Sequence, residues 1–184
     1  GQFSPIRLTP GVIDLVDLTE LQAEIDKAFI DADTDAKILA YTNNRVNDYN
    51  DYIRELRGLT ATYTVGEHLV NNGAVDMGRD KKMLSVEERV TITKLSEYTD
   101  FIDIDADVQL EVRYATLTND FLTTYTDVPL PENKEHYQAL IKHYQKVKNW
   151  VTYFKLKNEF PDLRPCDACT VHKSQGSTYD TVFI

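Results

Sequence analysis

A loop near the end of the chain collects side chains that can bind an anion. The stretch CTVHKSQGSTYDTVFI, residues 169–184, places His172, Lys173 and Gln175 beside Gly176, between two short apolar runs that predict strands. Side-chain donors and the backbone N–H groups of a glycine-containing turn can hold phosphate oxygens. Ligands bind at the ends of strands in open α/β sheets. The loop therefore predicts a site for a nucleotide or for the phosphates of a nucleic acid.

The segment CDAC, just before this loop, has the spacing of half a zinc site or of a redox pair. A zinc site needs two further ligands, and the candidates His136, His143 and His172 are not arranged in a recognisable order around Cys166 and Cys169. A thioredoxin-like pair opens a helix after a strand, whereas this one precedes a predicted strand. We expect two ordinary loop thiols and no metal site.

Two acidic clusters resemble the start of a calcium-binding loop, DADTD at 31–35 and DIDAD at 103–107. Such a loop needs glycine at its sixth position and glutamate at its twelfth. Neither cluster provides them, because these positions hold Ala36, Thr42, Val108 and Tyr114. We expect a solvated loop in the first case and a strand with its acids on the wet face in the second.

No segment of the sequence predicts a catalytic centre. There is no G-x-x-x-x-G-K-[ST] loop for the phosphates of a nucleotide, and there is no serine elbow of a hydrolase. This chain alone is therefore not expected to hydrolyse nucleotides, and we predict no catalytic residue and no metal ligand in it.

A basic segment with aromatic residues follows the middle of the chain. Residues 134–157 contain six lysines and one acid, Glu135, in a protein of net charge −10, and Trp150, Tyr153 and Phe154 lie among these lysines. Lysines interleaved with aromatic rings can hold phosphates and stack on bases. The same residues also fit an amphipathic helix with its aromatic residues in the core and its lysines in solvent. This second interpretation is the favoured one.

Strand and helix alternate in the segments that must position these residues. Residues 36–42 predict a compact apolar strand, and 43–58 predict a helix with one apolar face that stops at Gly58. The middle of the chain has short alternating runs of Thr, Val, Tyr and Ile between turns, which predict a small antiparallel barrel or sheet. The predicted fold class is α/β with a β-rich insertion.

These patterns divide the chain into four parts: 1–60 and 164–184 with α/β character, a β-rich insertion at 61–130 and a helical extension at 131–163. The length of 184 residues is enough for one domain with an insertion. No membrane span or signal peptide is visible. Two cysteines favour a reducing, cytoplasmic compartment, and the acidic net charge argues against binding nucleic acid by bulk electrostatics alone.

Two segments resemble motifs of superfamily-1 helicases. TVHKSQG at 170–176, with the apolar strand that follows, resembles motif V. ILAYTNNRVNDYNDYIREL at 38–56 resembles motif IV, through Asn43, Val46, Asn50, Ile53 and Arg54. Their order around a β-rich insertion resembles the RecD and phage Dda branch. The resemblance implies a partial RecA-like domain, called 2A, interrupted by an SH3-like antiparallel barrel, called 2B, and by a helical extension.

The resemblance also implies roles for single residues. The resemblance implies that His172 contacts single-stranded DNA directly. The other residues expected to bind this DNA are Thr170, Lys173, Gln175, Thr42 and Asn43. Gly176 is expected where the backbone closely approaches the nucleotide. Thr178 stands where many relatives have a glutamate that meets the nucleotide ribose, and a hydroxyl would form a weaker hydrogen bond there than a carboxylate.

For a longer parent protein the resemblance implies an ATP-dependent DNA helicase, moving 5′ to 3′, or the motor subunit of an exonuclease V complex. ATP and Mg²⁺ are expected in that parent, with a first RecA-like domain that carries the Walker segments, and no cofactor is expected for this chain alone. The implied partners are single-stranded DNA, that first domain and exonuclease subunits. The alternative is a non-catalytic module that binds nucleic acid or protein and keeps the helicase fold.

Overall fold

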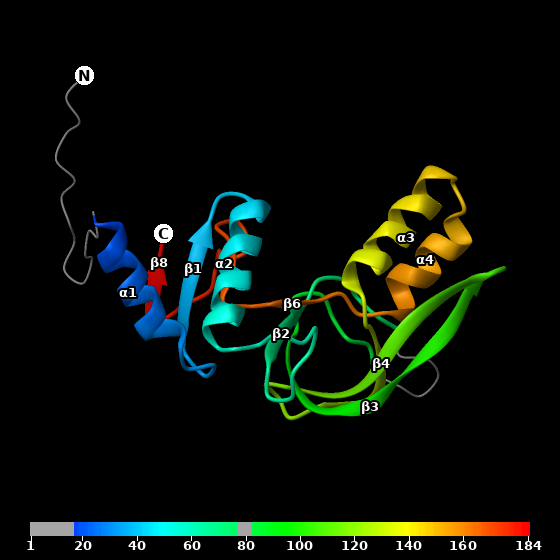
Figure 1. Ribbon diagram of the computed structural model, residues 1–184, viewed down its shortest axis with the longest axis horizontal. Helices are drawn as coiled ribbons and strands as arrows, with labels where there is room; N and C mark the ends of the chain where they lie inside the picture. The colour runs from blue at the N-terminus through cyan, green and yellow to red at the C-terminus, as the bar shows by residue number, and fades with distance from the viewer. Residues whose placement is uncertain (1–16, 77–81) are drawn as a thin grey trace, which may run out of the picture.

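Two β-sheets of different type lie next to one another in the computed structural model, which describes residues 17–76 and 82–184 (Figure 1). One sheet has three parallel strands, and the other has five antiparallel strands. The prediction of an α/β fold is confirmed at this level. No helix within the described ranges is long and apolar enough to cross a membrane.

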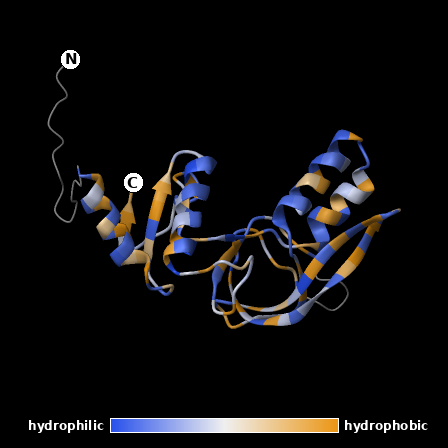
Figure 2. Cartoon of the chain, in the orientation of Figure 1, coloured by the Kyte–Doolittle hydropathy of each residue, from blue (hydrophilic) through white to orange (hydrophobic). Residues whose placement is uncertain are grey.

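The parallel unit combines elements from both ends of the described chain. They are α1 (Leu18–Phe29), β1 (Ala36–Ala40), α2 (Asn43–Leu56), β7 (Ala168–Thr170) and β8 (Thr181–Phe183). The strand order is β7-β1-β8, and Ala40 pairs with Thr170. The central strand β1 is mostly hydrophobic (Figure 2). Both helices pack apolar side chains, including Phe29 and Ile53, against this sheet because these residues recur at helical spacing.

Capping residues define where the two helices of this unit begin. Asp17 accepts a hydrogen bond from the Thr19 N–H at 2.8 Å, and Thr42 accepts one from the Arg45 N–H at 3.3 Å. Such side-chain caps satisfy N–H groups that lack a partner in the first turn. Gly58 follows α2 with a φ of +72°, a left-handed value that suits glycine. The predicted strand and the predicted helix after it are confirmed.

The antiparallel unit takes four strands from the middle of the chain and one from the returning segment. They are β2 (His68–Asn71), β3 (Arg89–Asp105), β4 (Val108–Asn119), β5 (Thr124–Pro131) and β6 (Leu163–Pro165). Their order is β5-β4-β3-β2-β6. The apolar runs at 88–95 and 101–106 belong to one strand, β3, because its pairing with β4 resumes after a bulge. The run at 60–65 forms bends and a turn instead of a strand.

The helical extension is a hairpin of α3 (Lys134–Lys146) and α4 (Trp150–Glu159). It packs on the far part of the long β3–β4 pair, and the shared core contains Leu110, Tyr144, Leu156 and Phe160. The outer end of this ribbon thus gains a small core of its own, separate from the core under the rest of the sheet.

The expectation that the aromatic residues of this hairpin lie in the core is wrong for two of the three. Trp150 is 47% exposed and Phe154 is 53% exposed, whereas Tyr153 is partly buried. Helix α4 instead buries Thr152 and Leu156. Because residues four apart lie on one face of a helix, burial of 152 and 156 turns 150 and 154 outward.

Candidate functional site

A cavity of about 340 Å³ lies where the parallel and antiparallel units meet. One wall comes from β1, the start of α2 and the end of β7, and the other from β2, β3 and β6. Its polar and ionisable lining consists of Lys37, Asn43, Asn47, Asn50, Asn72, Glu87, Arg89, Arg164, Cys166, Cys169, Thr170, Lys173, Ser177 and Tyr179. The cavity therefore joins residues from opposite ends of the sequence.

Positive charge dominates this lining. Among the described residues, four cationic side chains, Lys37, Arg89, Arg164 and Lys173, line the cavity with one carboxylate, Glu87. The whole chain carries a net charge of −10, so the cavity is a local reversal of the overall charge. A concave, cationic surface attracts anions even on an acidic protein, because clefts concentrate the field of the charges that line them.

Two of these cations are positioned by the register of the antiparallel sheet. Val70 on β2 pairs with Arg89 on β3 and with Arg164 on β6. Side chains at laterally paired positions point to the same face of a sheet, so the two arginines flank Val70 in one row. Arg164 forms a salt bridge with Asp162 at 2.9 Å. Arg89 forms no salt bridge within the described part of the chain.

Lys173 spans the two units. Its Nζ lies 3.0 Å from Asn72 Oδ1 and 3.2 Å from Glu87 Oε1, and both partners belong to the antiparallel unit. Glu87 has a φ of +62°, a left-handed conformation that costs free energy for a residue with a side chain. The backbone N–H of Glu87 donates to the Asn71 carbonyl at 2.7 Å, which holds the carboxylate at the rim of the cavity.

Three of the residues predicted to bind DNA line this cavity together. They are Asn43 at the start of α2, Thr170 at the end of β7 and Lys173 in the loop that follows. Ala40 and Thr170 are register partners at the ends of parallel strands. This pairing brings the start of α2 next to the β7–β8 loop.

The other predicted residues lie outside the lining. Thr42 is exposed, and its hydroxyl caps α2. The side chains of His172, Gln175 and Thr178 are exposed on the β7–β8 loop. Gly176 has a φ of +83° and no atom within 4 Å of where a Cβ would stand. Its role in the structure is therefore the left-handed turn, not a close approach of another part of this chain.

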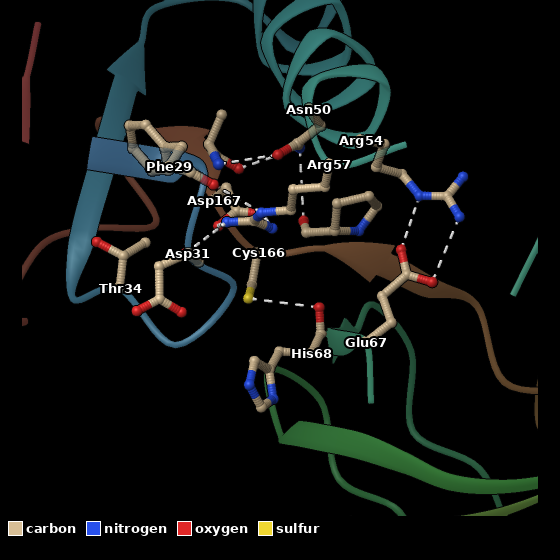
Figure 3. Close-up of polar contacts among 12 residues, drawn as sticks. Phe29, Asp31, Thr34, Asn50, Arg54, Arg57, Glu67, His68, Cys166 and Asp167 are labelled. Carbon is tan, nitrogen blue, oxygen red and sulfur yellow. Dashed lines mark hydrogen bonds and ion pairs between the residues drawn. The ribbon is translucent and has the colours of Figure 1, made fainter. Parts of the chain in front are cut away.

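Helix α2 also holds the returning segment in place (Figure 3). Asn50 accepts a hydrogen bond from the Ala168 N–H at 2.8 Å and donates to the Ala168 carbonyl at 3.3 Å. Arg54 donates a hydrogen bond at 2.7 Å to Glu67, the residue just before β2. The Glu67 side chain is almost fully buried. Two residues of the motif IV pattern thus connect the helix to β7 and to the antiparallel unit.

Two further polar contacts fix the junction. Both terminal nitrogens of Arg57 donate hydrogen bonds to the Asp167 carboxylate, each at 2.9 Å, and both side chains are 10% exposed. His68 Nε2 lies 2.7 Å from Asp33 Oδ1, and its Nδ1 lies 2.7 Å from Thr91 Oγ1. The hydrogen bond to His68 lowers the pKa of the Asp33 carboxyl. The charged and hydrogen-bonded contacts give the cavity walls a defined separation.

The sequence did not point to Lys37, Arg89 and Arg164 as site residues. Each is a single cation without a motif around it. Only the pairing of β1 with β7 and of β2 with β3 and β6 brings them together. A signal that was present is the alternation of β1, which places Lys37 on the opposite face from buried Ile38.

The other candidates for metal or redox chemistry have ordinary surroundings. Cys166 and Cys169 are free thiols, and burial raises the pKa of both, which favours the protonated form. Among the described residues no group of three or more His, Cys, Asp or Glu side chains is placed to hold a metal ion. The acidic residues of the 31–35 loop and of β3 at 103–105 are exposed, as expected.

Comparison of the sequence with protein-family models gives no match. Comparison with curated proteins gives no match either.

Proposed function

We propose that this chain is the strand-gripping part of an ATP-dependent DNA helicase of superfamily 1, in the RecD and Dda branch, and acts in the cytoplasm. In this proposal the parallel unit is a RecA-like domain 2A, and the antiparallel unit is an SH3-like insertion 2B. The cavity between them would hold the phosphates of single-stranded DNA. The parallel order β7-β1-β8 and the five-stranded antiparallel sheet are compatible with this assignment.

One observation carries the proposal. Asn43 and Thr170, which belong to the two motif-like segments, line the same cationic cavity as Lys173. Phosphate contacts come from lysine and arginine side chains, from polar side chains such as asparagine and threonine, and from backbone N–H groups. The cavity offers lysine, arginine, asparagine and threonine side chains together. Because these groups recognise the backbone and not the base edges, the grip would tolerate any base sequence.

The walls of the cavity suggest how the grip would respond to movement. Lys37 and Thr170 belong to the parallel unit, whereas Arg89 and Arg164 belong to the antiparallel unit. A displacement of one unit relative to the other would change the distances between the side chains of the two walls, and so the hold on the phosphates. In a helicase, closure around ATP by a first RecA-like domain would supply that displacement.

ATP and Mg²⁺ would be bound mainly by that first domain. In this chain Gly176 and Thr178 are the residues expected to lie near the nucleotide, and both are exposed. No cluster of metal-ligating side chains exists among the described residues, so the ligands of Mg²⁺ would come from the partner domain. We expect no ATP hydrolysis by this chain alone. Turnover of ATP by the purified chain would contradict the proposal.

Binding of fluorescently labelled oligo(dT), measured by anisotropy over a range of salt concentrations, tests the grip. The variants Arg89→Ala and Lys173→Ala should weaken binding. The slope of the logarithm of the binding constant against the logarithm of the salt concentration should become shallower by about 0.7 for each lost phosphate contact. Lys27→Ala, on the exposed face of α1 and outside the cavity, is the matched control. An equal effect of Lys27→Ala and Arg89→Ala, or no binding by the wild-type chain even at low salt, would rule out the cavity as the grip.

A further inference from the structure

The α3–α4 hairpin carries an aromatic cluster at the end of the molecule opposite to α1 (Figure 1). Trp150 and Tyr153 have ring centroids 5.4 Å apart, and Tyr153 and Phe154 have centroids 5.1 Å apart. Both pairs meet edge to face, and Trp150 and Phe154 are tilted by 39° at 6.5 Å. No pair is parallel, so the rings do not use their faces to stack on one another.

This cluster faces solvent together with aliphatic neighbours. Trp150 and Phe154 are about half exposed, and Val147 and Val151 beside them are exposed as well. The opposite side of α4 already packs Leu156 and its neighbours into the core of the hairpin. The outward side chains therefore contribute little to that core, and an exposed apolar surface of several adjacent residues indicates a binding surface.

Lysine is the commonest charged residue of this hairpin, although Lys134 lies over the Tyr63 ring and donates to the Leu163 carbonyl. The hairpin segment 134–157 holds six lysines, one acidic residue and no arginine. The Nζ atom of Lys157 lies 5.4 Å from the centre of the Tyr153 ring. Lys146 and Lys148 are exposed at the tip of the hairpin, while Lys155 donates to the Asp103 carbonyl at 3.0 Å and so fastens α4 to β3. Lysines thus outnumber acids on the hairpin itself, while Asp103 and Asp105 belong to the strand against which the hairpin packs.

We propose that this face of the hairpin binds single-stranded nucleic acid, with bases stacked on Trp150 and Phe154 and phosphates held by the lysines. Protein–protein interfaces are enriched in arginine and depleted in lysine, and this segment shows the reverse composition. Aromatic rings stack readily on the bases of a single strand, whereas the bases of a duplex are already stacked on one another. This face is a second contact, beyond the cavity, and its binding does not require the cavity.

Trp150 provides a direct test because it is the only tryptophan of the chain. Its fluorescence should be quenched when oligo(dT) of about 10 nucleotides stacks on it, and a duplex of the same length should quench far less. Phe154→Ala should weaken the binding that this signal reports by about 5- to 100-fold, the range found when a stacking residue is truncated. Phe121→Ala, which removes an exposed aromatic ring from the turn between β4 and β5, outside the hairpin, should leave it unchanged.

Two further experiments distinguish binding at the hairpin from binding in the cavity and from binding of a protein partner. The double variant Arg89→Ala/Lys173→Ala should still show quenching, since the cavity is remote from the reporter. Absence of quenching in the wild-type chain, or its loss in this double variant, would overturn the proposal while leaving the cavity test unaffected. Equal quenching by polyglutamate would also overturn it and would assign the face to an acidic protein. Thermal unfolding of each variant verifies that the fold is kept.

Discussion

Asn50 on α2 and Ala168 on β7 form a reciprocal pair of hydrogen bonds, although 118 positions separate them in the chain. The Asn50 side chain is 5% exposed and Ala168 is 2% exposed. One amide side chain thus satisfies both backbone groups of the strand residue. This contact sets the position of β7, and with it the start of the loop that carries Lys173.

Asn50→Ala should lower the free energy of unfolding by about 1–3 kcal/mol, because it leaves a buried N–H and a buried carbonyl without this partner. Urea unfolding followed by circular dichroism measures the change. Asn44→Ala, at an exposed position of the same helix, should change the stability by less than about 0.5 kcal/mol. Similar effects of the two substitutions would show that the Asn50 contact contributes no stability.

Arg57→Met should destabilise the chain by about 3–5 kcal/mol, since it leaves the buried Asp167 carboxylate without its counter-ion. The double variant Arg57→Met/Asp167→Leu should be more stable than Arg57→Met alone, because no unpaired charge then remains in the junction. Chemical unfolding of the wild type, the two single variants and the double variant gives the coupling free energy directly. Additive losses would mean that the two side chains do not depend on each other.

Glu87→Gln should tighten the binding of oligo(dT) about two- to fivefold at low salt. The substitution removes the one carboxylate that the described residues contribute to the cavity lining, and it frees Lys173 from a half-exposed ion pair, whose strength is limited by solvent. Anisotropy titrations provide the affinities. Glu97→Gln, at an exposed position of β3 outside the cavity lining, controls for the change in net charge, and an equal gain from this control would contradict the prediction.

The chain should lose stability between about pH 10 and pH 12, in part through Tyr125. Burial raises the pKa of Tyr125 to about 12, with a further contribution from Glu88, whereas an unfolded tyrosine ionises near pH 10. In this window the unfolded state has released a proton that the native state still holds, so the free energy of unfolding falls as pH rises, by at most about 1.4 kcal/mol per pH unit.

Tyr125→Phe should therefore make the stability curve flatter above pH 10. Urea unfolding at several alkaline pH values compares the two proteins. Burial also raises the pKa of Tyr63 and Tyr137, and these residues remain in both proteins, so the difference isolates Tyr125. Parallel curves for the wild type and the variant would show that Tyr125 ionises at the same pH in the native and unfolded states.

Cys166 should react slowly with iodoacetamide at pH 8, because burial raises its pKa and the thiolate is the reactive form. Cys169 should also be slower than a free thiol, for the same reason. Mass spectrometry of the alkylated peptides separates the two sites, and unfolding in urea should bring both to the same fast rate. Alkylation of Cys166 in the folded chain as fast as in urea would contradict a raised pKa of its thiol.

Local patterns in the sequence were sufficient to locate β1 and α2 of the parallel unit. The alternation around Ile38, the capping threonine at 42 and Gly58 after the helix act over a few residues, so their signals do not depend on distant contacts. The β-rich character of the middle was also visible. The bulged strand β3 was not, because a bulge is defined by the pairing of two strands and not by either strand alone.

The orientation of α4 shows the limit of a pattern within one helix. Trp150 and Phe154 look like core residues by type, and Thr152 looks like a surface residue. The structure reverses these positions because the face that meets β3 and β4 is chosen by the packing of Leu156 and Phe160 in the hairpin core. When both faces of a helix carry apolar residues, its own sequence leaves two orientations open, and tertiary packing selects one.

The candidate site divides in the same way. The sequence by itself determined the donor-rich loop at 170–176 and the polar start of α2, since both follow from residues adjacent in the chain. The tertiary structure alone decided that they share a cavity with Arg89 and Arg164, which the register of β2 with β3 and β6 brings to the two sides of Val70. Strand register depends on contacts between distant segments, and a shift by one residue would turn both arginines to the other face.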